Sequence, residues 1–469
     1  MNKNSIIQLI ALGGVPLLMV LGNSMLIPVF PEMQKTLNIS QFQVGLTITL
    51  FSIPAGISIP ILGFLSDKIG RKLIIVPSLI LYAIGGVISG IAPIVLQQQA
   101  YPLLLGGRIV QGIGAAGTGP IAMALVSDIF TGNQRSQAQG SVEAANGLGK
   151  VISPILGSLI AIIVWYAIFF VYAALAIPIA LAVWFLIKEP KPKQNNNSLG
   201  KYFQGIKKVF SQSGKSLIGS YLAASIVLFT LFGILSYLSD ILEVEYGLKG
   251  VIKGFALAGP VLAMSITSFV SGRILKNSPG LMKTFIVGGL AVLSLALIIL
   301  SVFKINIIFF IAILIMGTGT GLVLPAVNTA VTSAAPLAER GGITALYGTV
   351  RFFGVAAGPP TYSKLLELGK GTMFWGGSGI ALASLLVSFF LVSKKELSAN
   401  NQSENSSEKQ NNDTPNKDEK EHNSSSPPED QITVTTPSLR RGLIKLWKPV
   451  AGVTSGLTLL FIWLRRKQH

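Results

Sequence analysis

The sequence predicts an all-α membrane protein with twelve transmembrane helices in two six-helix bundles, related as a parallel pseudo-repeat and followed by a C-terminal extension. Three observations predict this fold. Half of the 469 residues are hydrophobic and 12% are charged, whereas soluble chains carry about 25% charged residues. Apolar stretches of about 20 residues, the length that crosses a hydrocarbon core as a helix, alternate with short polar gaps. The two halves also share one spacing of Gly, Pro and Arg.

The predicted spans follow one another with short loops. They are 6–29, 44–65, 73–93, 102–126, 140–163, 166–188, 217–239, 251–272, 282–303, 305–327, 341–360 and 372–393. Lys and Arg gather in alternate loops, and basic loops prefer the cytoplasmic side. We therefore expect a multi-pass protein of the cell (plasma) membrane, with a cytoplasmic N-terminus and an uncleaved first span.

Composition excludes several classes of protein. There is no cysteine, and the two histidines, His422 and His469, lie near the end of the chain, so the spans hold no thiol or histidine site. The net charge of +18 follows the loops, and we expect no nucleic-acid partner. No phosphate-binding Gly-x-x-x-x-Gly-Lys-Ser/Thr loop occurs, which excludes an ATP-driven pump as a single chain. We expect no metal, no cofactor and no enzymatic activity.

The chain divides into two halves at a polar linker. Residues 1–188 form an N-terminal bundle, 189–216 a Lys- and Asn-rich cytoplasmic linker, and 217–393 a C-terminal bundle. A shift of 205 positions aligns the fourth and fifth spans with the tenth and eleventh, placing Arg135 on Arg340. Parallel repeats of this kind are typical of secondary transporters, whose substrate site lies at the repeat interface.

The loop after the second span carries the most specific motif. It reads Gly63-Phe-Leu-Ser-Asp67-Lys68-Ile-Gly70-Arg71-Lys72 and resembles, at every constrained position, the signature loop of the major facilitator superfamily of membrane transporters. Gly63 and Gly70 permit close helix approach and a tight turn. Asp67 can face a helix N-terminus, where the helix dipole favours an anion. The alternative is that the basic residues of this loop only fix topology.

The fourth span opens with Arg108-Ile-Val-Gln111-Gly112-Ile-Gly114, which is similar to a second motif of that superfamily. The resemblance implies that Arg108 takes part in proton coupling; the alternative is a structural Arg bonded to neighbouring carbonyls.

The resemblance also implies a conformational latch, in which Asp128 pairs with Arg71 near Glu143 and locks the inner side in the outward-open state. As the alternative, Asp128 is an interfacial acid.

The fifth span carries a degraded form of the superfamily's antiporter motif, because Ser153 and Ser158 replace glycines; the eleventh span carries a cleaner form. The matching positions are Gly149, Pro154 and Gly157 in the fifth span and Gly354, Gly358 and Pro359 in the eleventh. Small residues at this spacing let helices pack closely, and Pro adds a kink.

Two cations lie deep in their spans. Lys150 and Arg351 each stand about ten residues, or ~15 Å, inside a predicted helix. Under the 205 shift, Arg351 matches Asn146, one turn before Lys150, so both cations could face a shared cavity. With Arg108 they would make that cavity basic, which favours neutral, zwitterionic or anionic cargo over cations. The alternative is that both are paired to carbonyls away from the substrate.

The resemblance implies a secondary active transporter of the superfamily, closest in pattern to bacterial drug:proton antiporters. We expect proton-coupled efflux of drugs or other small amphipathic molecules by alternating access, driven by the proton gradient, in a monomer that contacts membrane lipid. One alternative is an exporter or flippase of an endogenous amphiphile such as a glycolipid or sugar. Another, from a different class, is a membrane receptor or scaffold that does not transport.

The C-terminal extension has two parts. Residues 394–438 are rich in Asn, Ser, Glu, Lys and Pro, a composition that cannot bury a core and predicts disorder. Residues 439–469 place a short apolar run between basic flanks. We interpret this segment as an interfacial or re-entrant helix bound to anionic lipid, with a thirteenth span as the alternative.

Overall fold

The computed structural model describes residues 3–190, 199–303, 306–336 and 339–393, all within one compact unit. The predicted tail at 394–438 and the basic segment at 439–469 lie outside the described residues, as does part of the linker. The described chain is helical, with short connections between helices.

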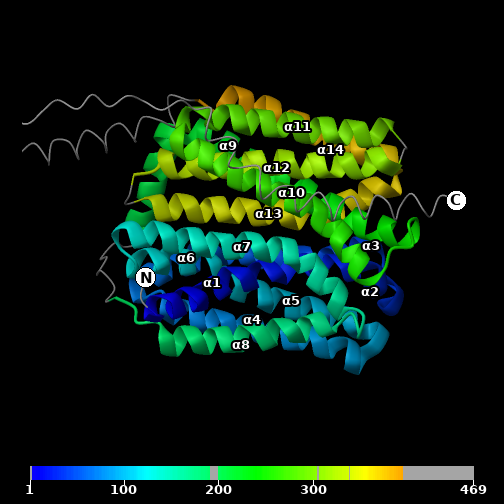
Figure 1. The fold of residues 1–469 in the computed structure, drawn as a ribbon, viewed down its shortest axis with the longest axis horizontal. Helices are drawn as coiled ribbons and strands as arrows, with labels where there is room; N and C mark the ends of the chain where they lie inside the picture. Colours follow the sequence, from blue (N-terminus) through cyan, green and yellow to red (C-terminus); the bar gives the residue numbers. More distant parts are fainter. Residues whose placement is uncertain (1–2, 191–198, 304–305, 337–338, 394–469) are drawn as a thin grey trace, which may run out of the picture. The chain divides into compact units, whose positions relative to one another are not determined.

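The first half of the chain forms one bundle, coloured blue to blue-green in Figure 1. Its elements are α1 (Lys3–Ser24), η1 (Ile27–Val29), α2 (Phe30–Leu37), α3 (Gln41–Ile69), α4 (Lys72–Leu96), η2 (Gln97–Ala100), α5 (Tyr101–Ala116), α6 (Gly119–Ile129), α7 (Gly132–Ile160) and α8 (Ala167–Leu186). The predicted fourth span is broken at Gly117 and Thr118, where α5 ends and α6 begins.

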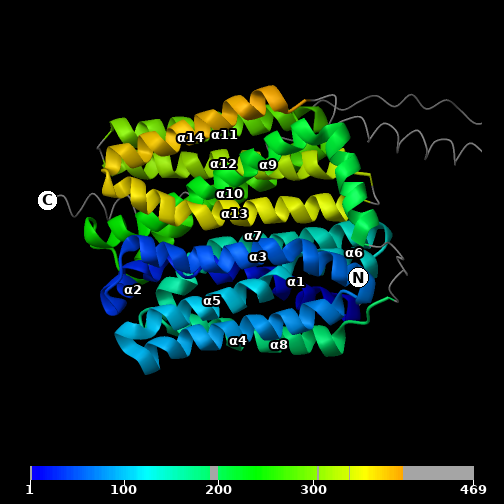
Figure 2. The same ribbon diagram turned by 180° about the vertical axis from the view of Figure 1, so that it is seen from behind.

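The second half forms the other bundle, coloured green to orange in Figures 1 and 2. Its elements are α9 (Leu199–Val244), α10 (Gly250–Asn277), η3 (Pro279–Leu281), α11 (Met282–Val302), α12 (Asn306–Ala334), α13 (Arg340–Glu367) and α14 (Lys370–Leu391). Helix α9 begins inside the predicted linker and contains a kink at Ser213, so the linker is partly helical.

The predicted twelve-span architecture is confirmed. Nine stretches of the described residues are long and apolar enough to cross a membrane, and one of them, Lys72–Ile129, contains two predicted spans. The remaining two spans are α7 and α13, which fall outside the nine stretches. These are the helices that carry Lys150 and Arg351, and polar helices of this kind lie where they face another helix rather than lipid.

The two bundles meet along two helix pairs. Helix α13 packs along α3, and α10 packs along α7. Both views show α7 and α13 at the boundary between the two halves (Figures 1 and 2). Several helices begin where local chemistry predicts: α3, for example, starts at a capping box in which Ser40 and Gln43 satisfy each other's backbone N–H groups.

The helical bundles have two ends, which we call the α2 end and the linker end. The α2 end holds α2 and the turn between α9 and α10, and lies at the right of Figure 1. The linker end holds the turn between α3 and α4 and the end of α8.

Candidate functional site

At the linker end, the signature loop forms a compact set of ion pairs. Helix α3 ends at Ile69, and Gly70 adopts φ = 114°, a conformation that L side chains rarely adopt. The Arg71 guanidinium pairs with Asp67 at 3.2 Å and, through Nε, with Asp128 at the end of α6. Asp128 therefore lies against Arg71 as the superfamily resemblance implies, although its role as a latch stays a prediction.

The same turn contains a residue that sequence analysis missed. Glu189, just after α8, accepts hydrogen bonds from the backbone N–H of Arg71 at 2.6 Å and of Lys72 at 3.0 Å. It caps the first turn of α4, where the helix dipole favours a negative charge. Asp67 was expected to face a helix N-terminus, but it lies in the last turn of α3, and Glu189 occupies that place instead.

Two members of the predicted latch lie apart from it. A Cβ added at Gly63 would meet no atom within 4 Å, so the close approach expected there is not made in this conformation. Glu143 is exposed on α7 and forms no ion pair with the described part of the chain. The structure thus joins Asp67, Arg71 and Asp128 without Gly63 or Glu143.

Arg108 is fully buried inside the first bundle. Its guanidinium donates to Thr47 O at 3.0 Å, to Gln111 Oε1 at 2.5 Å and to Asn23 Oδ1 at 2.8 Å. It also lies over the Phe51 ring, 4.3 Å from the centroid. These bonds join α1, α3 and α5, which favours the structural interpretation and separates Arg108 from Lys150 and Arg351.

Lys150, on α7, lies within electrostatic range of Arg351 on α13 and of Glu143 on its own helix. Tyr347 of α13 lies within range of the same two charges. The Arg351 guanidinium stands over the Tyr347 ring, 5.2 Å from the centroid. Both cations are partly buried, as is Asn146, one turn from Lys150. A polar cluster therefore spans the two bundles at the predicted depth.

At the α2 end, charged residues join the two bundles directly. Lys35 of α2 pairs with Glu243 of α9 at 3.1 Å, and Lys253 of α10 pairs with the same carboxylate at 2.9 Å. Lys253 is 2% exposed and also donates to Pro28 O of the first bundle at 2.8 Å. Sequence analysis did not predict this cluster.

Two further hydrogen bonds extend this inter-bundle cluster. Ser239 Oγ donates to Ile27 O at 2.6 Å, and Gln34 Nε2 donates to Asp240 Oδ1 at 3.5 Å. Along the neighbouring boundary, Thr49 of α3 donates to Ala356 O of α13 at 2.6 Å. The two bundles are therefore held together by polar contacts through the half nearer α2.

The motif glycines pack helices within each bundle. A Cβ at any of four of them would collide with a facing backbone carbonyl. The pairs are Gly112 with Phe51, Gly157 with Met25, Gly354 with Ser225, and Gly358 with Phe229. Gly149 makes looser contact, with Leu17 at 3.4 Å, while Pro154 and Pro359 lie at the bundle boundary, opposite Gly254 and Gly45 respectively.

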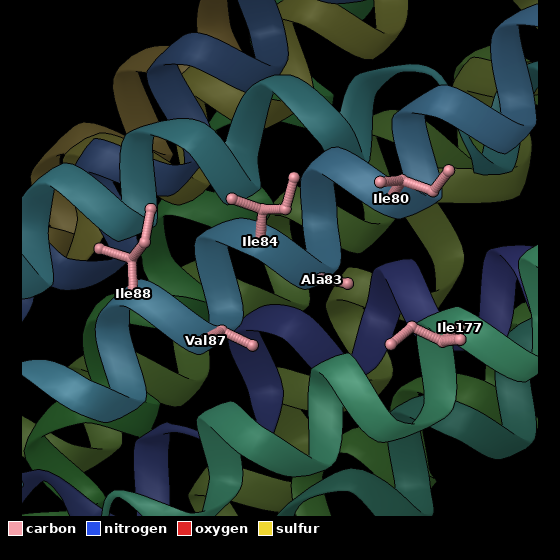
Figure 3. Close-up of a pocket in the computed structure, with 6 residues that line it drawn as sticks. All are labelled: Ile80, Ala83, Ile84, Val87, Ile88 and Ile177. Atoms are coloured by element: carbon pink, nitrogen blue, oxygen red, sulfur yellow. The ribbon is translucent and has the colours of Figure 1, made fainter.

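The surface of the first bundle carries a shallow apolar groove of about 250 Å³ between α4 and α8 (Figure 3). Its lining residues are Ile80, Ala83, Ile84, Val87, Ile88 and Ile177. These side chains offer no polar group, so the groove lacks the donors and acceptors by which a polar substrate is oriented. It lies away from the cluster formed by Lys150 and Arg351.

Comparison with known proteins agrees with this geometry. The Major Facilitator Superfamily profile matches residues 12–359. The chain belongs to this superfamily of membrane transporters, and its fold and signature loop are those of a small-molecule transporter.

Two relatives show the range within the superfamily. The chain is 38% identical over 391 residues to the bacillibactin exporter of Bacillus subtilis, covering 83% of this chain and 97% of that protein. It is 28% identical over 363 residues to the class B tetracycline resistance protein of Escherichia coli, covering 74% and 84%. Among solved structures, a D-xylose–proton symporter shares the fold, with a TM-score of 0.69 at 15% identity, over 84% of this chain and 98% of that one.

Proposed function

We propose that this chain exports a small molecule across the cell membrane in exchange for protons, by alternating access, with its N-terminus in the cytoplasm. The α2 end would then face outward, because the basic loops lie at the linker end. Superfamily membership supports the transport of a small molecule. The proton gradient, the orientation and the direction of transport belong to the proposal.

One observation carries the alternating-access part. On the helices that join the bundles, glycines near the α2 end are tightly packed: a Cβ at Gly45 would lie 3.1 Å from Pro360 N, and one at Gly254 would lie 2.8 Å from Pro154 O. Glycines near the linker end of the same helices, such as Gly63 and Gly341, would meet no atom within 4 Å. A boundary packed at one end and looser at the other is what rocking of two bundles produces.

The direction and cargo are inferred from relatives. A protein named as an exporter of bacillibactin is 38% identical over nearly its whole length, and a protein named for tetracycline resistance is 28% identical. These names favour efflux over uptake. They also favour a cell-made molecule over a drug as the principal cargo, since the more similar relative is named for a compound rather than for resistance.

The proposal is tested with purified full-length protein in liposomes that contain a pH-sensitive dye. A pH gradient is imposed, and bacillibactin, tetracycline or ethidium is added on either side. Coupled proton flux with at least one compound is expected, and it should disappear in Asp67→Asn, which removes one carboxylate from the Arg71 pairs.

Lys364→Met is the matched control, because Lys364 is exposed and its contacts, an ion pair with the neighbouring Glu367 and the Phe42 ring 5.1 Å away, lie apart from the Arg71 pairs. It should transport like the parent protein. Substrate flux that proceeds equally without a pH gradient would refute proton coupling. Absence of flux with every compound, in protein that stays folded, would refute efflux of this class of molecule and favour the non-transporting alternative.

A further inference from the structure

One face of α7 and one face of α13 bring two cations together across the bundle boundary. Glu143, Asn146 and Lys150 follow one another at helical spacing on α7, and Tyr347 and Arg351 do so on α13. Lys150 and Arg351 are close enough to repel each other. The faces therefore carry two positive charges and one negative charge, that of the exposed Glu143.

Neither cation is neutralised by the described part of the chain. Among the described residues, no ion pair includes Lys150 or Arg351, and Arg351 Nε is buried without an acceptor. Asn146 Oδ1 is likewise buried without a donor. Buried polar groups in folded proteins are normally satisfied, so an unsatisfied acceptor on α7 and an unsatisfied donor on α13, beside two unpaired cations, point to a missing partner.

The Arg351 guanidinium is held ready for such a partner. It lies over the Tyr347 ring, and Tyr347 is itself held by stacking on Tyr221 and by a hydrogen bond from its hydroxyl to Leu324 O at 3.3 Å. A guanidinium whose Nε is free can bind a carboxylate or a similar oxyanion in two-point geometry.

We propose that Lys150, Arg351 and Asn146 form a binding site, shared by the two bundles, for an organic anion that carries a hydroxyl group beside its anionic oxygens. The two cations bind the anionic oxygens, and the hydroxyl donates to Asn146 Oδ1. This inference rests on the proposed function, since it names the class of cargo that the exporter carries.

The position of the site couples binding to movement. Lys150 belongs to the first bundle and Arg351 to the second, so both cations contact one anion only while α7 and α13 stay close. An anion in the site offsets the repulsion that otherwise opposes this approach. A cationic cargo would instead add a third positive charge, so the site discriminates by charge.

The test is equilibrium binding to the full chain in phosphatidylcholine nanodiscs, by calorimetry, with three probes that share a naphthalene ring. They are 3-hydroxy-2-naphthoate, its neutral amide and 2-naphthylmethylammonium. The parent protein should bind the anion most tightly. Lys150→Met and Arg351→Met should each weaken anion binding by about tenfold or more, because each removes a charge-assisted hydrogen bond. Affinity for the amide should change less than about twofold.

Conservative and control variants separate this role from a structural one. Lys150→Arg and Arg351→Lys should keep most of the anion affinity, and Lys364→Met, on the same helix as Arg351, should keep all of it. Without ligand, the two Met variants should melt at a temperature equal to or above that of the parent, because each removes an unpaired, partly buried cation. Unchanged anion affinity in both Met variants, or equal loss for all three probes, overturns the proposal.

A second arm separates cargo from lipid. The titrations are repeated in nanodiscs that contain anionic phosphatidylglycerol. If this lipid displaces the naphthoate from the parent protein, the site holds a headgroup, and the assignment to cargo is overturned. Anion binding without proton-driven efflux would refute the proposed function and leave the site standing. Efflux that is indifferent to both Met substitutions would refute the site and leave the function standing.

Discussion

The two ends of the helical body use their charges differently. At the α2 end, Lys35 and Lys253 converge on Glu243, and the Lys35 pair and the bond from Lys253 to Pro28 O cross from one bundle to the other. At the linker end, Arg71 pairs with Asp67 and Asp128, and all three belong to the first bundle. Separating the bundles therefore breaks the Lys35–Glu243 pair and the bond from Lys253 to Pro28 O, but leaves the signature-loop pairs intact. We call the α2-end contacts between the bundles, Lys35 with Glu243 and Lys253 with Pro28 O, the tie. We call the signature-loop ion pairs, together with the Glu189 cap, the brace, because they stabilise the first bundle alone.

Because the chain has no cysteine, a single introduced thiol can report on the tie. Ala356 is 2% exposed, and its carbonyl accepts a hydrogen bond from Thr49 of the other bundle. In protein that carries Ala356→Cys, the rate of thiol labelling measures how often the α2 half opens. The variants below are compared in this background.

The largest effect is expected from Gly254→Val. A Cβ there would lie 2.8 Å from Pro154 O, a backbone atom that cannot swing aside, so the substitution forces α10 away from α7. Overpacking of this kind costs about 3 kcal/mol, which corresponds to a ~100-fold rise in labelling. Gly63→Val, on α3 at the linker end, meets no atom and should leave labelling unchanged. Equal effects from the two valines would mean that the ends do not differ in packing.

Lys253→Met should have the next largest effect. Lys253 is 2% exposed, and its loss removes both the pair with Glu243 and the bond to Pro28 O. Of these two contacts, the bond to Pro28 O crosses between the bundles, and a hydrogen bond from a charged group contributes about 2 kcal/mol to holding them together. Labelling should then rise ~30-fold. Lys249→Met removes the same charge from an exposed site at the same end, and a comparable rise there would attribute the effect to net charge.

Glu189→Gln tests the brace at the linker end. The carboxylate accepts from two N–H groups at the start of α4, and loss of such a cap costs about 1 kcal/mol. We expect faster hydrogen exchange at the amides of Arg71 and Lys72 and a lower melting temperature. Labelling of Ala356→Cys should stay at the parent rate, because the cap lies within one bundle. A rise in labelling would show that the brace and the tie are coupled.

The sequence predicted what depends on local pattern. Apolar length located the spans, and the 205 shift placed Lys150 and Arg351 on matching faces, which the structure brings within electrostatic range. The sequence also suggested that Arg108 faces the same cavity as Lys150 and Arg351. In the structure, Arg108 instead bonds to Asn23, Gln111 and Thr47 inside the first bundle. Depth along a helix is readable from sequence, whereas the direction that a side chain faces depends on the neighbouring helices.

Residues that act through distant partners were not predictable. Glu189 caps a helix that begins more than a hundred positions earlier in the chain, and no spacing rule links the two. Lys253 stands near the start of a span, where a lysine ordinarily reaches the membrane surface, and only the packed α2 end explains its burial. Both contacts require that segments distant in the chain first be placed next to each other in space.

The smallest effect is expected from Lys35→Met. Its side chain is 62% exposed, so the pair with Glu243 is screened by water and contributes about 0.5 kcal/mol, or a ~2-fold rise in labelling. The rise should vanish in high salt, because exposed pairs are already screened there. The effect of Lys253→Met should persist in the same salt, since that ammonium is buried. If salt abolished both effects, the tie at the α2 end would be a surface attraction, and the distinction from the signature loop would reduce to packing alone.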